Sequence, residues 1–357
     1  MKRFACGTEL YCGENALEHL RALGAKRVLL VTDSYFSKNG TAARVLQKTG
    51  AEGEIFDRAQ PDPPACLAAE GAAVLQRLRP DLLVALGGGS SLDCAKGILL
   101  AADYRPRFAA VPTTSGTGSE VTSYAVLTHD GVKHPLTDAA LRPDIAILDE
   151  SLLRDLPPAL IADAGMDAAA HCLEALCARD ATPLSDAMAG CALDTLLRLL
   201  PVSYGGDASL RGEIHTAAAM AGLGFDNAGL GLTHAMAHAL GGAFHIPHGR
   251  LCGVLLPHVM DFNRDAALEK YAHAARLCGL GAATELLAFR NLRQAVIRLR
   301  RQLQLPATLT EAGIGRKDLE AASDGLIRAA LQDPCLFGNP RPATAQDMEK
   351  LLREAAE

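Results

Sequence analysis

The sequence lacks the marks of several classes of protein. No apolar run reaches the length that a membrane-spanning helix needs. Lysine and arginine number 35 against 41 acidic residues, the formal net charge is −6 and no basic block appears, so we expect neither a nucleic-acid nor a membrane partner. The ten cysteines have no C-x-x-C spacing, and the first residues, M-K-R-F, do not begin a signal peptide. These features predict free thiols in a cytoplasmic protein.

Histidine, in contrast, is concentrated in one short stretch. His234, His238, His245 and His248 lie within fifteen residues, although the whole chain has only 11 histidines. A single histidine in such a stretch is usually a buried side chain that bonds to a neighbouring carbonyl group. Four together indicate part of a metal site, because imidazole is the commonest metal ligand among side chains.

The spacing of these residues suggests how the chain brings them together. His234 and His238 are four residues apart and therefore share one face of a helix. The glycine pair at 241–242 is expected to weaken that helix and Pro247 to interrupt it, so that the two later histidines return toward it on a loop. Spacing alone does not decide which of the four bind the metal.

A carboxylate ligand is available upstream, in G-M-D-A-A-A-H. Asp167 and His171 are four residues apart in an alanine-rich helical run, so both side chains project from one face. On its own, such a pair is more often a surface hydrogen bond. Beside the histidine cluster, one carboxylate with two or three imidazoles suits a divalent first-row metal that keeps a position open for substrate.

The pattern of apolar segments predicts two domains, which the length of 357 residues also favours. In residues 1–156 short apolar strands alternate with helices, which predicts a Rossmann-like, dinucleotide-binding α/β domain with a parallel sheet. Its strands are expected at 27–31, 82–86, 108–111 and 145–148, and its helices near 16–23, 42–48, 64–78 and 90–101. Residues 157–357 predict an all-helical, metal-binding domain, with helices near 158–177, 184–200, 211–222, 250–262, 283–303, 317–331 and 345–356.

Two glycine-rich turns in the first domain could hold a nucleotide. L-G-G-G-S-S-L-D (86–93) follows a predicted strand and opens a helix, where backbone N–H groups and the helix dipole attract phosphate. P-T-T-S-G-T-G-S-E (112–120) offers hydroxyl groups. Either turn alone is more often an ordinary loop, but together they imply a dinucleotide beside a metal-held substrate. Asp33, at the end of the first predicted strand, could bind a ribose hydroxyl or only begin a turn.

Four motifs in this order resemble those of the iron-dependent, group III alcohol dehydrogenases. They are G-G-G-S-x-x-D-x-A-K from Gly87, P-T-T-S-G-T-G-S-E-V-T from Pro112, G-M-D-A-x-x-H from Gly165 and H-x-M-A-H-x-L-G-x-x-F-H-x-P-H-G from His234. The resemblance spans nearly the whole chain, including C-L-F-G-N-P-R from Cys335. Within the family, the pattern is most similar to the short 1-propanol dehydrogenases and to the alcohol dehydrogenase half of bifunctional aldehyde-alcohol dehydrogenases.

The resemblance implies a fold like that of dehydroquinate synthase and gives roles to individual residues. It implies that Fe²⁺, or Zn²⁺, is bound by Asp167, His171, His234 and His248. His238 is implied as the proton-handling residue beside the metal, with His245 as the competing candidate and a packing role as the alternative. Phe225 and Cys335 are implied to line the substrate pocket. Contacts with NAD(H) are implied for Asp33, Asp62, Gly87, Gly88, Gly89, Ser90, Asp93, Thr113, Thr114, Thr117, Val126, Lys133 and Leu160. Some family members have Asn in place of Asp62 or His245.

The implied activity is the interconversion of short aldehydes (acetaldehyde, propanal, butanal) and primary alcohols by a homo-oligomer, most simply a dimer, that a microcompartment could enclose. The apolar segment 4–12 also favours a dimer, as an edge strand that needs cover. A glycerol- or 1,3-propanediol-type polyol dehydrogenase is the nearer alternative. A lyase like dehydroquinate synthase is a more distant one, because the helical domain shows no basic cluster near its metal ligands to anchor phosphate. A non-catalytic protein would not need four metal ligands together with a cofactor site.

Overall fold

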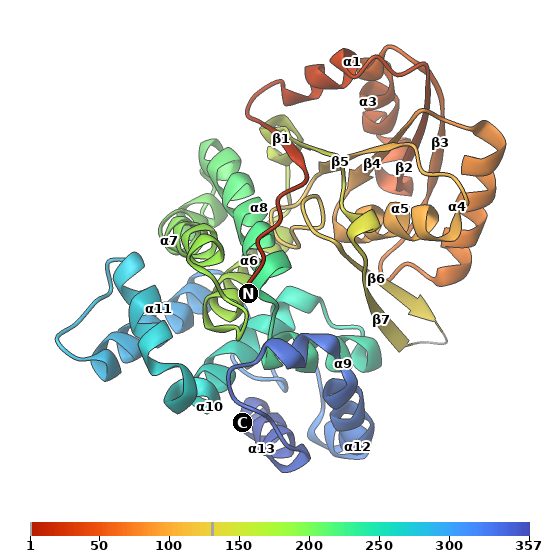
Figure 1. Cartoon of the computed structure of the whole chain (residues 1–357). Helices are drawn as coiled ribbons and strands as arrows, with labels where there is room; N and C mark the ends of the chain where they lie inside the picture. The colour runs from red at the N-terminus through yellow and green to blue at the C-terminus, as the bar shows by residue number, and fades with distance from the viewer. Residues whose placement is uncertain (1, 130–131) are drawn as a thin grey trace. The chain divides into compact units, whose positions relative to one another are not determined.

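The computed structural model describes residues 2–129 and 132–357, which form two compact units (Figure 1). One unit, Cys6–Leu156, is built on a sheet. The other contains Pro157–Glu357 together with residues 2–5 and is helical. An α/β domain followed by an all-helical domain is therefore confirmed as the fold class. None of the described helices is both long and apolar enough to cross a membrane.

Six parallel strands form the main sheet, in the order β1-β8-β5-β4-β2-β3. The strands are β1 (Glu9–Cys12), β2 (Arg27–Asp33), β3 (Glu52–Ala59), β4 (Leu82–Gly87), β5 (Arg107–Pro112) and β8 (Ile145–Leu148). The helices of this unit are α1 (His19–Ala22), α2 (Ser34–Lys38), α3 (Thr41–Thr49), α4 (Ala65–Leu78) and α5 (Gly89–Ala101). Because every strand is parallel, the loops that follow β2, β4 and β5 leave the same edge of the sheet.

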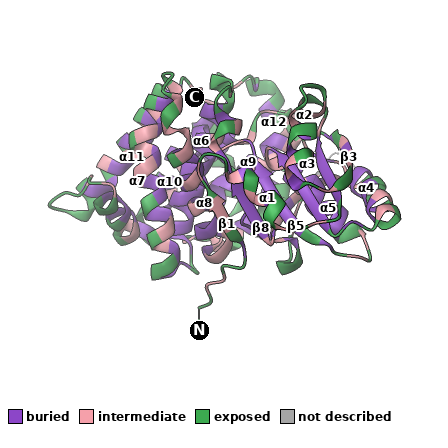
Figure 2. Ribbon diagram, turned by 90° about the horizontal axis from the view of Figure 1, so that it is seen from above, coloured by how far each residue is buried: buried purple, intermediate pink, exposed green. Residues whose placement is uncertain are grey.

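Both faces of this sheet are buried, as in other parallel sheets covered by helices. Along β2, Leu29 and Val31 belong to a core that includes residues of α4 and α5. Val28 and Leu30 point to the opposite face, into a core that includes residues of α1 and α3. Figure 2 shows the strands largely in purple, the colour of buried residues.

The short helix α2, strand β3 and one pair of strands outside the main sheet are missing from the sequence prediction. β3, with the sequence E-G-E-I-F-D-R-A, lies at an edge of the sheet and is half exposed, so it has no continuous apolar run. β6 (Tyr124–His129) and β7 (Val132–Thr137) form a separate antiparallel pair. The four strands with unbroken apolar cores form at the predicted positions, and β1 is an edge strand within the predicted segment 4–12.

Helix α6 (Pro158–Cys177) is the centre of the helical unit. Nearly all of its residues from Ile161 onward are buried, and it packs against α7, α8 and α10. Proline at its first position fits a helix start, because that N–H would have no partner in the helix. The other helices are α7 (Pro183–Tyr204), α8 (Arg211–Ala228), α9 (Leu232–Phe244), α10 (His248–Leu277), α11 (Glu285–Gln302), α12 (Arg316–Gln332) and α13 (Ala345–Ala356).

The helix in the histidine-rich stretch is interrupted just before Pro247, as predicted, but His248 then begins a second helix and does not lie on a loop. Helix α9 continues through the glycine pair at 241–242 and ends at Phe244. His245 then takes a left-handed conformation (φ 55°), and Pro247 is the N-cap of α10, which begins at His248. Packing of the mostly buried α9 compensates for the poor helix propensity of glycine. A left-handed residue followed by proline ends the helix.

Residues 2–5 bond to the helical unit, although they lie within the segment predicted as the first domain. Lys2 Nζ donates to the carbonyl oxygens of Arg179 (3.1 Å) and Ala181 (2.6 Å). The N–H of Ala5 donates to Asn227 Oδ1 (2.5 Å), and Asn227 Nδ2 donates to the carbonyl oxygen of Ala5 (3.1 Å). These four bonds fix the segment that precedes β1.

Candidate metal centre and nucleotide-binding loops

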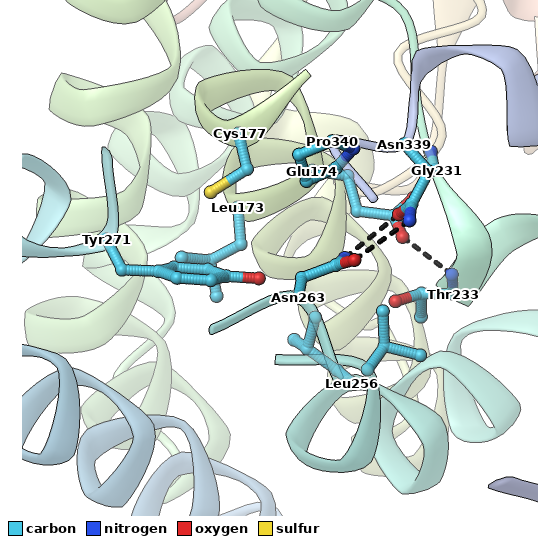
Figure 3. Close-up of a pocket in the computed structure, with 11 residues that line it drawn as sticks. Leu173, Glu174, Cys177, Gly231, Thr233, Leu256, Asn263, Tyr271, Asn339 and Pro340 are labelled. Atoms are coloured by element: carbon cyan, nitrogen blue, oxygen red, sulfur yellow. Dashed lines mark hydrogen bonds between the residues drawn. The ribbon is translucent and has the colours of Figure 1, made fainter. Parts of the chain in front are cut away.

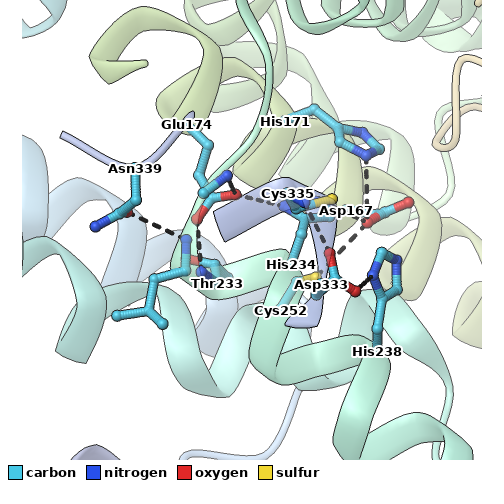
Figure 4. A network of polar contacts seen from close by, with 12 residues as sticks. Asp167, His171, Glu174, Thr233, His234, His238, Cys252, Asp333, Cys335 and Asn339 are labelled. Carbon is cyan, nitrogen blue, oxygen red and sulfur yellow. Dashed lines mark hydrogen bonds and ion pairs between the residues drawn. The ribbon is translucent and has the colours of Figure 1, made fainter. Parts of the chain in front are cut away.

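Three helices of the helical unit bring the four predicted metal ligands together. Figure 4 labels three of them, Asp167, His171 and His234. Asp167 and His171 lie one turn apart on α6, as the spacing predicts. His234 lies on α9 and His248 is the first residue of α10. Segments far apart in the sequence therefore contribute to one cluster.

The donor atoms of this cluster converge on one oxygen, Oδ1 of Asp167. The Nε2 atoms of His248, His234 and His171 lie 3.4, 3.6 and 3.9 Å from it. Nitrogen and oxygen ligands bound to one tetrahedral ion at roughly 2.0–2.2 Å lie about 3.4 Å from one another. The distances from Asp167 to His248 and His234 fit a single divalent first-row ion, and donor atoms of these three residues and of Cys252 all lie within 4.8 Å of one another. His171 is near Asp167 but is not part of that group.

Burial makes the cluster hard to explain without a cation. Asp167, His171 and His234 are buried, and Nε2 of His234 has no hydrogen-bond partner among the residues that the structure describes. A buried polar atom without a partner destabilises the folded state by about 1–3 kcal/mol. A cation at this point would give that nitrogen a partner, so the residues present fit a bound metal.

Electrostatic interactions keep Asp167 ionised. Burial alone would raise its pKa, but His171, His248 and His234 outweigh burial and hold the pKa below its ordinary value. Burial lowers the pKa of His234, whereas the carboxylates of Glu174 and Asp167 raise it to about 9, so a cation that binds Nε2 would displace a proton and leave the ring neutral. A carboxylate that stays charged inside the protein is a suitable partner for a cation.

Gly249 allows α10 to approach α6 closely. A Cβ atom at this position would overlap the carbonyl oxygen of Asp163 and lie 3.1 Å from Cβ of Asp167. The glycine of the H-G pair therefore lets His248 reach Asp167. Arg250, one residue later, adds an ion pair with Asp163 (Nη2 to Oδ2, 3.0 Å).

Two residues beside the ligands are absent from the sequence prediction. Glu174 follows His171 by three positions on α6 and faces the same cluster. Cys252 follows His248 by four positions on α10, and its Sγ lies 3.7 Å from Asp167 Oδ1 and 3.5 Å from His248 Nε2. Helical spacing from a predicted ligand could have identified both residues.

His238 lies beside the ligands and is bonded to Asp333. Its Nδ1 is 2.8 Å from Asp333 Oδ2, and its ring stacks on that of His248 with centroids 5.0 Å apart. The N–H of Cys335 donates to Asp333 Oδ1 at the start of the 3-10 helix η5 (Pro334–Gly338), which fixes the carboxylate. No local pattern marks Asp333, because 95 positions separate it from His238. His245, in contrast, is an exposed residue at the end of α9.

Both residues predicted for the substrate pocket contact this region. Phe225, on α8, stacks on the predicted ligand His171 with ring centroids 4.4 Å apart. Cys335 lies close to His238 and Asp333: one side-chain donor atom of each residue lies within 4.8 Å of those of the other two. Burial holds the pKa of the Cys335 thiol well above its ordinary value, so it remains neutral. All ten cysteines are free thiols, as predicted.

In the α/β unit, the two glycine-rich turns meet at the ends of β4 and β5. Gly87 ends β4 with φ 145°, a conformation that favours glycine, and its carbonyl oxygen accepts the N–H of Thr113 (2.9 Å). Gly88 is the N-cap of α5 and provides no side chain to cap it. The N–H groups at the start of α5 can therefore bind an anion such as a pyrophosphate.

Asp33 lies at the point where a doubly wound sheet usually binds its ligand. β2 and β4 are neighbours, but the strands that follow them, β3 and β5, lie on opposite sides of the pair. Asp33 Oδ1 accepts the N–H groups of Tyr35 (2.8 Å) and Phe36 (3.2 Å) and caps α2. Its Oδ2 lies only 3.7 Å from where a Cβ of Gly87 would be. One oxygen begins a turn, and the other faces the glycine-rich loop.

Asp93 differs from Asp33 because both of its oxygens are bonded within the unit. Oδ1 accepts the hydroxyl of Ser119 (2.7 Å), and Oδ2 accepts the N–H of Val126 (3.0 Å). Burial raises the pKa of this carboxyl group. Asp93 and Val126 thus hold the second glycine-rich turn against β6.

Asp62 and Lys133 form an ion pair, with Nζ 2.6 Å from Oδ1. Asp62 has φ 53°, close to the 55° of His245. Asn, Asp and His are the side chains most often found in this left-handed region. The backbone at both positions would therefore also suit Asn.

The other predicted nucleotide contacts lie in both units. Gly89 and Ser90 form the first turn of α5, and Thr114 and Thr117 lie in the turn after β5. Leu160 is an exposed residue in the first turn of α6, in the helical unit.

Two family models match the chain. The model described as iron-containing alcohol dehydrogenase matches residues 7–150. The model described as the C-terminal region of the Fe-containing alcohol dehydrogenase family matches residues 161–356. Together they cover nearly the whole sequence.

Individual relatives match at full length. The 1-propanol dehydrogenase PduQ of Citrobacter freundii is 38% identical over 99% of this chain and 100% of its own. The NADPH-dependent butanol dehydrogenase of Clostridium saccharobutylicum is 34% identical over 99% of this chain and 97% of its own. A solved structure of a 1,3-propanediol oxidoreductase has a TM-score of 0.93 and 35% identity, and covers 99% of this chain and 100% of that one.

Proposed function

Because the chain belongs to the iron-containing alcohol dehydrogenase family, we propose that it interconverts short-chain aldehydes and primary alcohols with NAD(H) at a divalent metal, Fe²⁺ in preference to Zn²⁺. The observation that carries this proposal is the convergence of three imidazole nitrogens on Asp167 Oδ1, at 3.4 to 3.9 Å. Such a donor set suits a catalytic ion with a position open for substrate.

Asp167, His171, His234 and His248 would hold the ion. When bound, the ion supplies Lewis-acid stabilisation of negative charge on the substrate oxygen, and the nicotinamide supplies the hydride. One carboxylate and three neutral imidazoles offset only half of a divalent charge. Stacking of Phe225 on His171 keeps that ring in place.

His238 would transfer the proton at the substrate oxygen. Asp333 accepts the hydrogen on Nδ1 of His238, so Nε2 of the neutral ring has a lone pair that can take up a proton and return it. Stacking on His248 keeps the His238 ring beside a ligand. The exposure of His245 and its place at the end of α9 favour His238 over it.

The substrate is proposed to be a short, unbranched aldehyde or alcohol. Phe225 and the neutral Cys335 offer few partners to additional hydroxyl groups, and each unpaired hydroxyl weakens binding by about 1–3 kcal/mol. We therefore expect kcat/KM for 1-propanol to exceed that for glycerol by at least about tenfold. Steady-state assays of anaerobically purified, metal-loaded protein measure this ratio. Higher kcat/KM for glycerol would support the polyol alternative.

The same preparation tests the proposed reaction class. NADH should be oxidised with propanal, and much more slowly with dihydroxyacetone. The substrate of dehydroquinate synthase should give no turnover. Turnover of that substrate without NADH oxidation would contradict the proposal.

NAD(H) is proposed as the preferred cofactor because Asp33 Oδ2 faces the glycine-rich loop. A carboxylate there accepts a hydrogen bond from a ribose 2′-hydroxyl and repels a 2′-phosphate. Asp33→Gly is expected to raise kcat/KM with NADPH relative to kcat/KM with NADH by about tenfold or more. The substitution removes the repulsion between the carboxylate and the 2′-phosphate, which weakens NADPH binding by more than about 1.4 kcal/mol. The ratio is measured by initial rates with each cofactor.

Asp33→Asn is the matched control, because Asn also caps helices but carries no charge. Glycine at an N-cap weakens a helix by only a few tenths of a kcal/mol, so α2 should form in both variants. An intermediate cofactor ratio is expected for Asp33→Asn. Equal efficiency with both cofactors in the parent protein would contradict the assignment.

A further inference from the structure

Glu174 is a buried carboxylate that accepts hydrogen bonds from three N–H groups (Figure 4). Oε2 lies 2.7 Å from His234 Nδ1 and 2.7 Å from the backbone nitrogen of Gly231. Oε1 accepts the backbone N–H of Thr233 at 2.6 Å. An ionised carboxylate only accepts hydrogen bonds, so the hydrogen on the Glu174 side of the His234 ring lies on Nδ1.

This bond decides what the other ring nitrogen can do. With Nδ1 protonated, Nε2 of His234 is the only ring nitrogen that can bind a cation. Nε2 lies 3.6 Å from Asp167 Oδ1 and has no hydrogen-bond partner among the described residues. Glu174 and the open ligand position thus lie on opposite sides of one ring.

The same carboxylate fixes the start of the helix that carries His234. Gly231, the N-cap of α9, has no side chain to cap the helix. Glu174 accepts two of the first N–H groups, and Asn339 Oδ1 accepts that of Leu232 (3.1 Å). Asn339 is held in turn by a pair of hydrogen bonds with Asn263, at 2.9 and 2.8 Å (Figure 3). The first turn of α9 is therefore tied to α6 and α10.

We propose that Glu174 is a positioning residue of the metal centre. By accepting the Nδ1 hydrogen and holding the first turn of α9, it keeps His234 Nε2 directed at the ion with its lone pair available. The inference rests on the proposed metal centre and adds a residue that does not touch the ion. Carboxylates that hold a ligand histidine in this way are common behind metal sites.

Glu174→Gln should disrupt this arrangement even though the two side chains have nearly the same shape. Glutamine has one oxygen, whereas three N–H groups approach the two oxygens of Glu174. If the amide NH₂ faces Thr233, it meets the backbone N–H of Thr233, and the two donors repel each other. If it faces His234, that ring must accept at Nδ1 and carry its hydrogen on Nε2, which removes the lone pair from the metal side.

The test compares divalent-metal affinity in the parent, Glu174→Gln and Ser203→Ala, each stripped of metal and titrated anaerobically with Fe²⁺, or with Zn²⁺ against a competing chelator. The dissociation constant of Glu174→Gln should rise by roughly 10–100-fold. Ser203→Ala is the control. It removes a buried hydroxyl that has no hydrogen-bond partner among the described residues, on helix α7, which carries none of the proposed ligands. Its affinity should stay within about threefold of the parent value.

Two further measurements separate positioning from a purely structural role. Thermal unfolding of the metal-free proteins reports loss of the helix cap, whereas the visible spectrum of Co²⁺-loaded protein reports the ligand geometry. A lower Tm with parental affinity and spectrum would overturn the inference. Glu174→Asp, which keeps the charge but shortens the side chain, is also expected to bind metal more weakly and serves if Glu174→Gln does not fold. If the variant that folds binds metal with parental affinity, the role of Glu174 is refuted and the metal centre is not. If the parent protein binds no divalent ion, both the metal centre and the role of Glu174 are refuted.

Discussion

His248→Ala is expected to leave the protein folded, to remove its metal and to abolish most of its activity. The His248 side chain is 26% exposed, against 1% for His234, so its truncation leaves little buried cavity. Its Nε2 lies 3.4 Å from Asp167 Oδ1, closer than the other imidazoles. Loss of the Lewis acid removes several kcal/mol of transition-state stabilisation, which corresponds to a fall in kcat/KM of roughly 10³-fold or more.

Metal analysis of anaerobically purified protein, together with circular dichroism, checks this expectation. His245→Asn is the matched control, because His245 belongs to the same histidine-rich stretch, is exposed and has a left-handed backbone that suits Asn. It should keep its metal and its activity. Full metal occupancy in His248→Ala would remove His248 from the ligand set.

His238→Gln is expected to keep its metal and its affinity for NADH and to lose kcat by roughly 10²–10⁴-fold, the usual contribution of a general acid–base group. Glutamine can still donate to Asp333 Oδ2, so the neighbourhood of His248 and η5 should be preserved. It cannot take up and return a proton. The change therefore separates proton transfer from packing.

The discriminating readouts are kcat as a function of pH and metal content in the same preparation. The profile of kcat against pH should differ between the variant and the parent, because glutamine cannot exchange a proton with the substrate. His245→Asn again serves as the control, because His245 is the competing proton donor. Intact metal with near-parental kcat in His238→Gln would exclude His238 and direct attention to His245.

Strands with a continuous apolar sequence could be predicted, and those without one could not. β2, β4, β5 and β8 are buried on both faces, so every position along them favours an apolar residue. β3 is at an edge and the β6–β7 pair lies outside the main sheet, so neither needs an unbroken apolar run. Their position is decided by pairing with distant strands, which local sequence does not encode.

Helical spacing predicted the parts of the metal centre that lie within one helix. Asp167 and His171 lie one turn apart on the same face of α6, and His248 starts a second helix after Pro247. The partner of His238 comes from residue 333, and the partners of the first turn of α9 come from residues 174 and 339. Such pairs form only when the helices pack, and a single sequence gives no measure of that packing.

His245 shows why proximity in sequence was not enough. It lies three residues before a ligand, yet it is exposed, because the chain turns through a left-handed conformation at this position to end α9. The sequence indicated a break at Pro247, but it did not show that His245 takes the left-handed conformation that ends α9. The exact residue at which the helix stops decides which histidines face the centre.

The bonds of residues 2–5 to Arg179, Ala181 and Asn227 have a consequence for the order of synthesis. The chain enters the sheet unit after residue 5 and leaves it at Leu156, so that unit is a continuous insertion into a discontinuous helical one. All six strands of the sheet have been made before α6 appears, and the sheet unit can fold while the ribosome is still translating. Lys2 can meet its partners only after Ala181 has been made, and Ala5 only after Asn227. The helical unit therefore depends on contacts between segments that the whole sheet unit separates in the sequence.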